Sequence, residues 1–399
     1  MKATYVKIKK NSIVSIFFIL LLLPYLEPLG FKEEFCGSDI IDTVYTAFKI
    51  AFFIGLLAYY MYQGKISRMF LCQATWAGIL LFSTLNNGSG FAGFKMYAGP
   101  ALAPLGVILV FDIFHKRLKD CVPILSRLFV VYCAINLITF IEQYYIVYQG
   151  NMPDGVGRYF FSIDNRFVFY FIPAIACALI VAYGKEKKMT VTLLFLMVHA
   201  EIMLVTLWSV GAMLAMTLII LWIIVIYRFT NPQLIHIKTY LLIIMIANLC
   251  LYIVAFVEPI NLIFQFIADA WLQKGSNLED RFVMWKRAMK LLASSPVLGV
   301  GIKEIEFNYL RFGVSHAHNL FMDIAFKGGV LSLISFGGVL VYALRPLYKY
   351  RNNILSRQLS FLVFISLVLS LVDTYSDSLF YTLLCLCYHM DVFLTEPVQ

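Results

Sequence analysis

Long runs of apolar residues, separated by short polar segments, recur along the whole chain. Each run is roughly 18 to 22 residues long, which is the length an α-helix needs to cross a hydrocarbon layer. The approximate cores of about twelve such runs are 12–30, 40–62, 69–86, 96–114, 123–146, 166–183, 189–206, 209–227, 239–257, 319–343, 359–374 and 376–394. The pattern predicts an all-α, polytopic membrane protein in which residues 1–399 form a single integral membrane domain.

The composition excludes a water-soluble protein. Of the 399 residues, 61% are hydrophobic and only 14% are charged, which is too few charges to cover the surface of a soluble protein of this length. The net charge of +9 does not indicate nucleic-acid binding, because the basic residues form short clusters between the apolar runs. We therefore attribute the excess of lysine and arginine to membrane topology, and expect membrane lipids but no nucleic acid among the partners.

The positions of the basic residues predict the orientation. Lysine and arginine concentrate in alternate loops, for example in 2–10, 116–127, 185–188 and 345–357. Cytoplasmic loops carry such an excess, so both termini are expected on the cytoplasmic side of the membrane. The first apolar run follows four lysines, as in a signal peptide, but it is long and lacks a small-residue cleavage site, so we expect a retained helix.

One extracytoplasmic loop, 258–317, is much longer than the others and is rich in basic residues. These are Lys274, Arg281, Lys286, Arg287, Lys290, Lys303 and Arg311. Long loops can carry positive charge outside without disturbing orientation, so the residues could simply be tolerated there. An anionic substrate would account for the cluster more directly.

Within this loop, 276–296 reads as an amphipathic helix. Phe282, Trp285, Met289 and Leu292 recur at three- and four-residue steps and form an apolar face, which Arg281 borders. The helix could lie on the membrane surface with its basic side in water. Alternatively, its apolar face packs against the bundle and holds Arg281 over a cavity.

Two further loop segments hold candidate binding groups. In 296–304, Gly299 and Gly301 suit a tight turn with exposed backbone N–H groups. In the loop 151–167, Arg158 has glycines before it and aromatic residues after it, whereas Arg166 begins the next apolar run. An arginine at a membrane boundary commonly reaches lipid phosphates, so for Arg166 that role competes with catalysis.

Four polar residues begin the run that follows the long loop, in the stretch HNLFMDIAFK. Asn319, Asp323 and Lys327 follow one another at four-residue steps along one stripe of the expected helix, directly after His318. Charged groups in a membrane-spanning helix are costly and usually mark a reaction site, a pathway or an ion pair. Asp323 and Lys327 are natural partners, and the pair could be purely structural. His318 could likewise only bind headgroups or a loop carbonyl.

Together these segments resemble the superfamily of Wzy-type polysaccharide repeat-unit polymerases and O-antigen ligases. The resemblance lies in HNLFMDIAFKGG (residues 318–329), in Arg281 with Trp285 four residues later, and in the Pro-x-x-Gly-x-Gly of 296–301. The segment Arg158-Tyr159 with Asn165 resembles a further family motif. The resemblance covers roughly 158–332, and the first half of the chain matches only in topology.

The resemblance implies glycosyl transfer at the outer face of the cytoplasmic membrane of a bacterial cell. The expected substrate is an oligosaccharide repeat unit on undecaprenyl pyrophosphate, which would be joined to another with release of the lipid pyrophosphate. A guanidinium binds phosphate oxygens in pairs, so Arg281 and Arg158 are the candidates that hold the diphosphate. An imidazole titrates near neutral pH, so His318 is the candidate base, with Asn319 orienting it or the substrate.

The remaining candidates would support the binding site. Trp285, Arg166, Asp323, Lys327, Gly299 and Gly301 are expected to bind or position the substrate. Glu201, an acid inside an apolar run, could pair with an arginine or act as an alternative base. Pyrophosphate is a good leaving group and no outward acidic cluster with metal-ligand spacing is evident, so neither a metal nor another cofactor is expected.

Three functions remain open from the sequence. The first is a polymerase of capsule, exopolysaccharide or O-antigen repeat units, with a flippase and a chain-length regulator as possible partners. The second is a ligase that transfers glycan to another acceptor. The third is a flippase or other transporter of lipid-linked oligosaccharide, which about twelve spans would fit. Against the transporter, the two halves show no internal repeat, and a basic loop as long as 258–317 is unusual in transporters.

Overall fold

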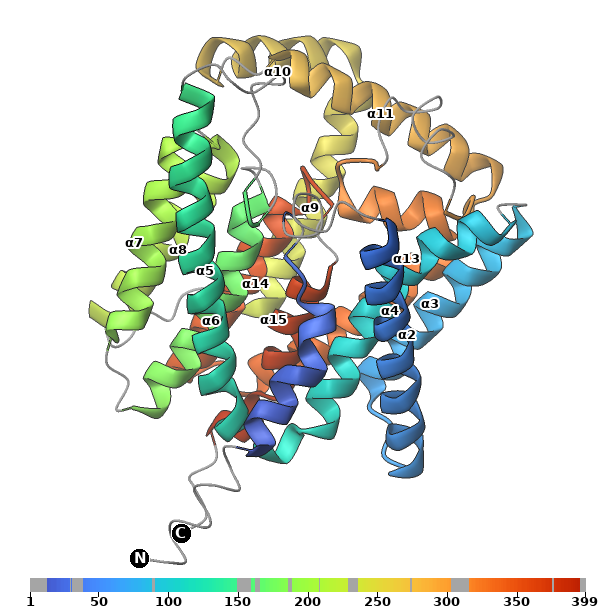
Figure 1. The fold of residues 1–399 in the computed structure, drawn as a ribbon. Coiled ribbons are helices and arrows are strands. Elements are labelled where there is room, and N and C mark those ends of the chain that lie inside the picture. Colours follow the sequence, from blue (N-terminus) through green and yellow to red (C-terminus); the bar gives the residue numbers. More distant parts are fainter. Residues whose placement is uncertain are drawn as a thin grey trace, which may run out of the picture.

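The computed structural model describes most of the chain, and its helices lie side by side in a bundle (Figure 1). The described residues are 13–28, 30, 39–87, 90–148, 159–161, 166–185, 189–207, 209–228, 236–272, 275–302, 316–374 and 377–394. After the first helical segment, Ile13–Tyr25, the helices are α2 (Asp39–Tyr62), α3 (Arg68–Asn86), α4 (Gly90–Ile113), α5 (Leu118–Tyr148), α6 (Phe167–Gly184), α7 (Val191–Thr206), α8 (Val210–Arg228), α9 (Ile237–Phe256), α10 (Glu258–Leu272), α11 (Gly275–Ser294), α13 (Leu320–Lys349), α14 (Ile354–Leu369), α15 (Ser378–Tyr388) and α16 (Met390–Leu394).

The predicted fold class, an all-α polytopic membrane protein, is confirmed. Every predicted apolar run contains a helix. Among the described residues, six helices are long and apolar enough to cross a membrane by themselves, and six further apolar helices are shorter. The number of spans and the single-domain organisation therefore stay predictions. The predicted run 359–374 is displaced, because α14 begins at Ile354 and ends at Leu369, and residues 370–374 lie outside the helices; the last predicted run, 376–394, contains α15 and α16.

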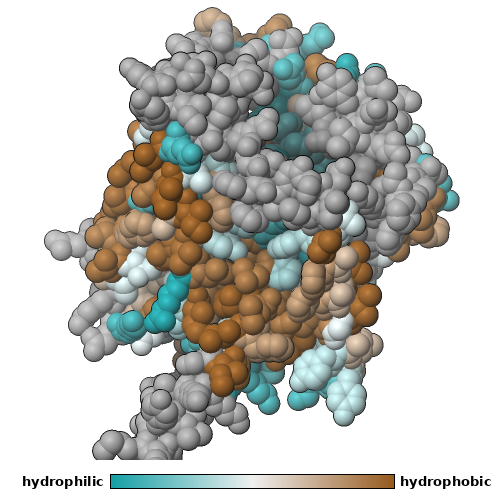
Figure 2. All heavy atoms as spheres, in the orientation of Figure 1, coloured by the Kyte–Doolittle hydropathy of each residue, from teal (hydrophilic) through white to brown (hydrophobic). Residues whose placement is uncertain are grey.

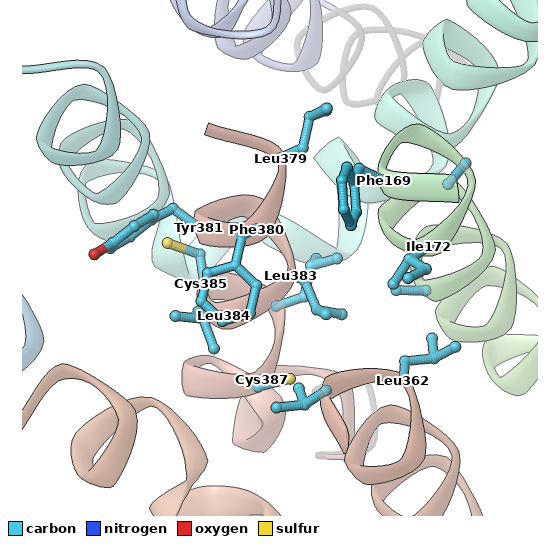
Figure 3. Close-up of a cluster of buried hydrophobic side chains, with 14 of the residues drawn as sticks. Phe169, Ile172, Leu362, Leu379, Phe380, Tyr381, Leu383, Leu384, Cys385 and Cys387 are labelled. Atoms are coloured by element: carbon cyan, nitrogen blue, oxygen red, sulfur yellow. The ribbon is translucent and has the colours of Figure 1, made fainter. Parts of the chain in front are cut away.

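The core of the bundle lies around α6 and α15. Nearly every residue of α6 and residues 378–387 of α15 are buried. Figure 3 shows side chains of α15, such as Leu379 and Leu383, facing Phe169 and Ile172 of α6 and Leu362 of α14. These two helices are apolar on all sides because they are surrounded by other helices.

The outer helices present apolar side chains to their surroundings. Large exposed apolar residues on α2, α8 and α9 are Phe48, Ile54, Leu218, Leu221, Met245 and Leu249. In Figure 2 the hydrophobic residues gather over the middle of the molecule, and hydrophilic ones are more frequent towards both ends. This distribution is expected of a bundle whose middle is in contact with lipid.

Two helices of the long loop, α10 and α11, lie at one end of the bundle (Figure 1). The helix predicted at 276–296 is confirmed as α11, whereas α10 was not predicted. The apolar face of α11 packs against the bundle, since Phe282 and Trp285 are almost fully buried. Met289 is the exception, because its side chain is 37% exposed; Ala288 takes the inward position instead. The alternative that the apolar face of α11 lies on the membrane surface is therefore wrong, because that face is buried against the bundle.

The helix α13 is interrupted at Gly329, where the backbone is left-handed with φ of 67°. The interruption frees backbone groups that the segment 296–301 satisfies. Val300 and Gly301 donate their N–H groups to the carbonyls of Phe326 and Lys327, both at 2.8 Å, and Val330 donates to Pro296 at 2.9 Å. Non-helical backbone inside a membrane protein is stable only when its polar groups are paired in this way. The Pro-x-x-Gly-x-Gly segment and the glycine of α13 therefore form one structural unit.

Replacing Gly329 with alanine is expected to destabilise the protein by about 2 kcal/mol or more, because of the left-handed backbone. The new Cβ would also lie 2.1 Å from the carbonyl oxygen of Val297. Gly337 in the same helix is the matched control, because a Cβ there meets nothing within 4 Å and helix propensity favours alanine. Thermal unfolding in detergent should show a lower Tm for Gly329→Ala and an unchanged or higher Tm for Gly337→Ala. Equal effects would contradict this account of the kink.

Candidate active site

Three titratable side chains meet where α13 begins and the turn after α14 passes. The Nε2 atom of His316 and the Nδ1 atom of His318 each lie 3.6 Å from Oδ1 of Asp373. The two imidazole rings are 4.1 Å apart between centroids. All three side chains are partly exposed, so a ligand can reach them. We call these residues the His–Asp cluster.

The backbone of His318 is strained. Its φ of +46° is the only positive value outside glycine among the described residues. A non-glycine residue rarely adopts this conformation, and where it persists the strain often serves a functional site. The sequence analysis placed His318 on the helix, which is wrong: α13 begins at Leu320, and the left-handed turn at His318 directs the imidazole towards Asp373.

The Asp373 carboxylate is held ionised by its neighbours. Burial alone would raise the pKa of this carboxyl group. The neighbouring imidazoles of His316 and His318, and the backbone N–H of Thr374 that donates to Oδ1 at 2.7 Å, outweigh the burial, and the pKa lies well below its usual range. An ionised Asp373 can orient an imidazole and stabilise the imidazolium that forms when His318 accepts a proton.

Arg281 reaches the same turn from α11. Its guanidinium donates a hydrogen bond through Nη1 to the carbonyl oxygen of Val372, the residue before Asp373. Burial lowers the pKa of Arg281 and the charge of Asp373 opposes that shift, so the guanidinium stays charged. Arg281 and His318 thus both reach the turn at 372–373.

Asn319 fixes the backbone around the cluster. It is fully buried, and its Oδ1 atom accepts the N–H of Met322 at 2.9 Å, which caps α13. Its Nδ2 group donates to the carbonyl of Leu371 and to Oδ1 of Asn248, both at 3.0 Å. All polar atoms of this amide are engaged within the protein, which favours a positioning role over direct contact with substrate.

Trp285 has a similar role from α11. Its indole Nε1 donates to the carbonyl of Ala317 at 2.8 Å, between the two histidines in the chain. The ring is fully buried and packs edge-on against Phe282 with 5.7 Å between centroids. One helix of the long loop therefore positions both the guanidinium and the histidine segment.

Asp323 and Lys327 form the ion pair expected from their spacing. Nζ of Lys327 lies 2.6 Å from Oδ2 of Asp323, and Oδ1 of Asp323 accepts the N–H of Ala317 at 3.2 Å. The carboxylate thus ties the histidine segment to the first turn of α13. This arrangement favours the structural reading of the pair.

Neutralising both members of this pair is expected to be milder than neutralising either one. A single Asp323→Asn or Lys327→Met variant leaves one charge without its partner in a largely buried place, which costs more than removing both. Thermal unfolding of the four proteins should give a coupling of about 1–3 kcal/mol. Independent, additive losses would contradict the pairing.

Gly299 and Gly301 do not present the exposed N–H groups expected from the sequence. The N–H of Gly299 donates to the carbonyl of Ser295, and that of Gly301 to Lys327, both at 2.8 Å. Both glycines have positive φ, and a Cβ at either would lie 2.6 Å from the nearest backbone atom of Gly328 or Thr84. Both glycines are required for close backbone packing. Their N–H groups are already used within the protein, so neither is free to donate to a substrate.

The other candidates lie apart from the cluster or outside the described residues. Arg166 precedes α6, and its charge acts on Asp377, whose side chain caps α15. Glu201 accepts a hydrogen bond from Thr217 of α8 at 2.6 Å, so within the described part of the chain its partner is a hydroxyl and not an arginine. Arg158, like the motif residue Asn165, lies outside the described residues.

The sequence analysis assigned no role to Asp373 or to His316. The available signal was topological: Asp373 lies at the end of the predicted run 359–374, on the side of the membrane expected for the long loop. The donor atoms of His316, His318 and Asp373 lie within 4.8 Å of one another, so among the described residues these are the ones that could hold a metal ion.

The chain was also compared with known proteins. The comparison with curated proteins finds no match. Residues 192–337 match the family model described as O-antigen ligase. The matched segment runs from α7 into α13 and contains Arg281, Trp285, His316 and His318, whereas Asp373 lies beyond it. This match supports a function in membrane glycan processing. The match over residues 192–337 is consistent with the superfamily that the motifs resemble.

Proposed function

We propose that the protein is a polysaccharide polymerase that joins repeat units carried on undecaprenyl pyrophosphate, at the outer face of the cytoplasmic membrane. The observation that carries the proposal is the convergence of the Arg281 guanidinium and the His–Asp cluster on the turn at 372–373. These groups supply a cation for a diphosphate and a base for a hydroxyl. In Figure 2 a hydrophilic hollow opens at the end of the molecule where α10 and α11 lie.

In the proposed reaction, a sugar hydroxyl of one lipid-linked unit attacks the anomeric carbon of the other. His318 accepts the hydroxyl proton while the new C–O bond forms, and Asp373 stabilises the resulting imidazolium. The bond between the anomeric carbon and the diphosphate breaks, and its electron pair leaves with the lipid diphosphate. The Arg281 guanidinium stabilises the negative charge that develops on the leaving oxygen.

A ligase is the second candidate, because the matched family model is described as O-antigen ligase. The two enzymes would share the donor and differ in the acceptor. A polymerase must bind two lipids that each carry a diphosphate. The positive charge of the seven basic residues in the loop 258–317 matches two diphosphates better than one. We therefore place the polymerase first.

The proposal is tested by the glycolipids that accumulate when the protein is deleted. Loss of a polymerase is expected to leave single repeat units on the lipid carrier. Loss of a ligase would instead leave long polymer on the carrier, and mass spectrometry of extracted glycolipids separates the two. Unchanged surface glycan and unchanged carrier-linked intermediates would contradict both.

The proposed reaction does not require a metal ion, since the guanidinium supplies positive charge and the diphosphate is a good leaving group. Transfer activity of the purified protein is therefore expected to survive EDTA. The arrangement of His316, His318 and Asp373 makes this a sharp test, because these residues could hold a divalent cation. Loss of activity with EDTA and recovery with added Zn²⁺ or Mn²⁺ would contradict metal independence.

A further inference from the structure

A large cavity lies at the end of the bundle opposite α10 and α11. Its volume is about 910 Å³, and it lies between the beginning of α5, the end of α6, the beginning of α7 and α16. None of the residues of the candidate active site lines it.

Within the described part of the chain, the charged residues that line this cavity are all basic. They are Lys119 and Arg127 on α5 and Lys185 at the end of α6. Within the described chain, the side chains of Arg127 and Lys185 make no hydrogen bond or ion pair with another residue, and both residues are exposed. Positive charge without a carboxylate among the described lining residues favours an anionic ligand.

The lining becomes apolar within one helical turn of these basic residues. On α5, Val130 and Val131 follow Arg127 by three and four positions, so they lie on the same side of the helix. On α6, Val181 and Ala178 precede Lys185 by one and two turns in the same direction along the bundle. Phe393 and Leu394 of α16 add further apolar surface. The cavity is thus basic at its outer end and apolar farther in.

We propose that this cavity binds one anionic phospholipid of the adjacent leaflet. Its phosphate would lie between Arg127 and Lys185, and an acyl chain would cover the apolar wall. Basic pockets between membrane helices on the cytoplasmic side bind anionic headgroups in this way. A free phosphate ion would leave the apolar wall uncovered, so the amphipathic ligand fits the lining better. The lipid would bridge α5, α6 and α7 and thereby stabilise their packing.

The proposal is tested by native mass spectrometry and thermal unfolding of the full chain in detergent. Phosphatidylglycerol is expected to bind with a stoichiometry of one and to raise Tm. Phosphatidylcholine with the same acyl chains should do neither. The Arg127→Gln/Lys185→Gln variant is expected to bind phosphatidylglycerol at least tenfold more weakly. A Lys65→Gln/Lys349→Gln variant is the matched control, because these lysines line a different pocket at the same end.

Two further experiments distinguish the contribution of the headgroup to binding from that of the acyl chain. Val131→Trp should weaken binding of the lipid. Because Val131 is half-exposed, the Tm of this variant without lipid is expected to be unchanged. Inorganic phosphate at millimolar concentration should not reproduce the Tm shift. Equal binding of both lipids, equal weakening in both double variants, or a full shift with phosphate alone would overturn the proposal.

Discussion

Replacing His318 is expected to abolish polymer formation while the protein still folds and binds its donor. A positioned general base contributes about 10²–10⁴-fold in rate, so transfer should fall by that factor. Asparagine is the informative substitution, because it tolerates the left-handed backbone that His318 adopts and cannot act as a base. His318→Ala should be equally inactive and somewhat less stable. Transfer is measured with purified protein and lipid-linked donor, and surface glycan is examined on a gel.

The matched control for this experiment is His236→Ala. His236 precedes α9, is exposed, and its side chain does not cap that helix. Its replacement should leave both activity and Tm unchanged. A His318→Asn protein that retains polymer at the wild-type level would remove the imidazole from the mechanism.

Much of the fold could be predicted because the membrane limits the possible structures. Only helices satisfy the backbone in hydrocarbon without neighbouring strands, so each long apolar run had one reasonable interpretation. The same reasoning could not predict α10, because EPINLIFQFIADAWL is too short and too polar at its start to be read as a span. It also could not predict the break at Gly329, since the backbone pairs that compensate for it come from residues about thirty positions earlier.

The candidate site was predictable in part. Spacing was sufficient for the pair of Asp323 and Lys327, because residues four apart on a helix are neighbours by geometry. The convergence of Arg281 and His318 required the family resemblance. Asp373 was missed because its importance lies in a contact across the bundle between segments more than fifty residues apart, which no local pattern encodes.

If the guanidinium binds the diphosphate through two N–H donors, Arg281→Lys is expected to lower the transfer rate by about 10²-fold, nearly as much as Arg281→Ala. A lysine keeps the charge and loses the planar fork. Arg287, which is exposed on the same helix, is the matched control: Arg287→Lys should have wild-type activity. Restoration of transfer by Arg281→Lys would show that charge alone is sufficient.

The kinetic form of the Arg281 defect separates catalysis from structure. Arg281 also holds the carbonyl of Val372, so its loss could merely loosen the turn that carries Asp373. If the guanidinium stabilises charge that develops on the leaving diphosphate, kcat falls far more than KM rises. A donor with a more reactive leaving group should then recover much of the lost rate in Arg281→Ala. If Arg281→Ala instead lowers the rate equally with both donors and also lowers Tm, Arg281 supports the turn. The diphosphate would then have no proposed partner.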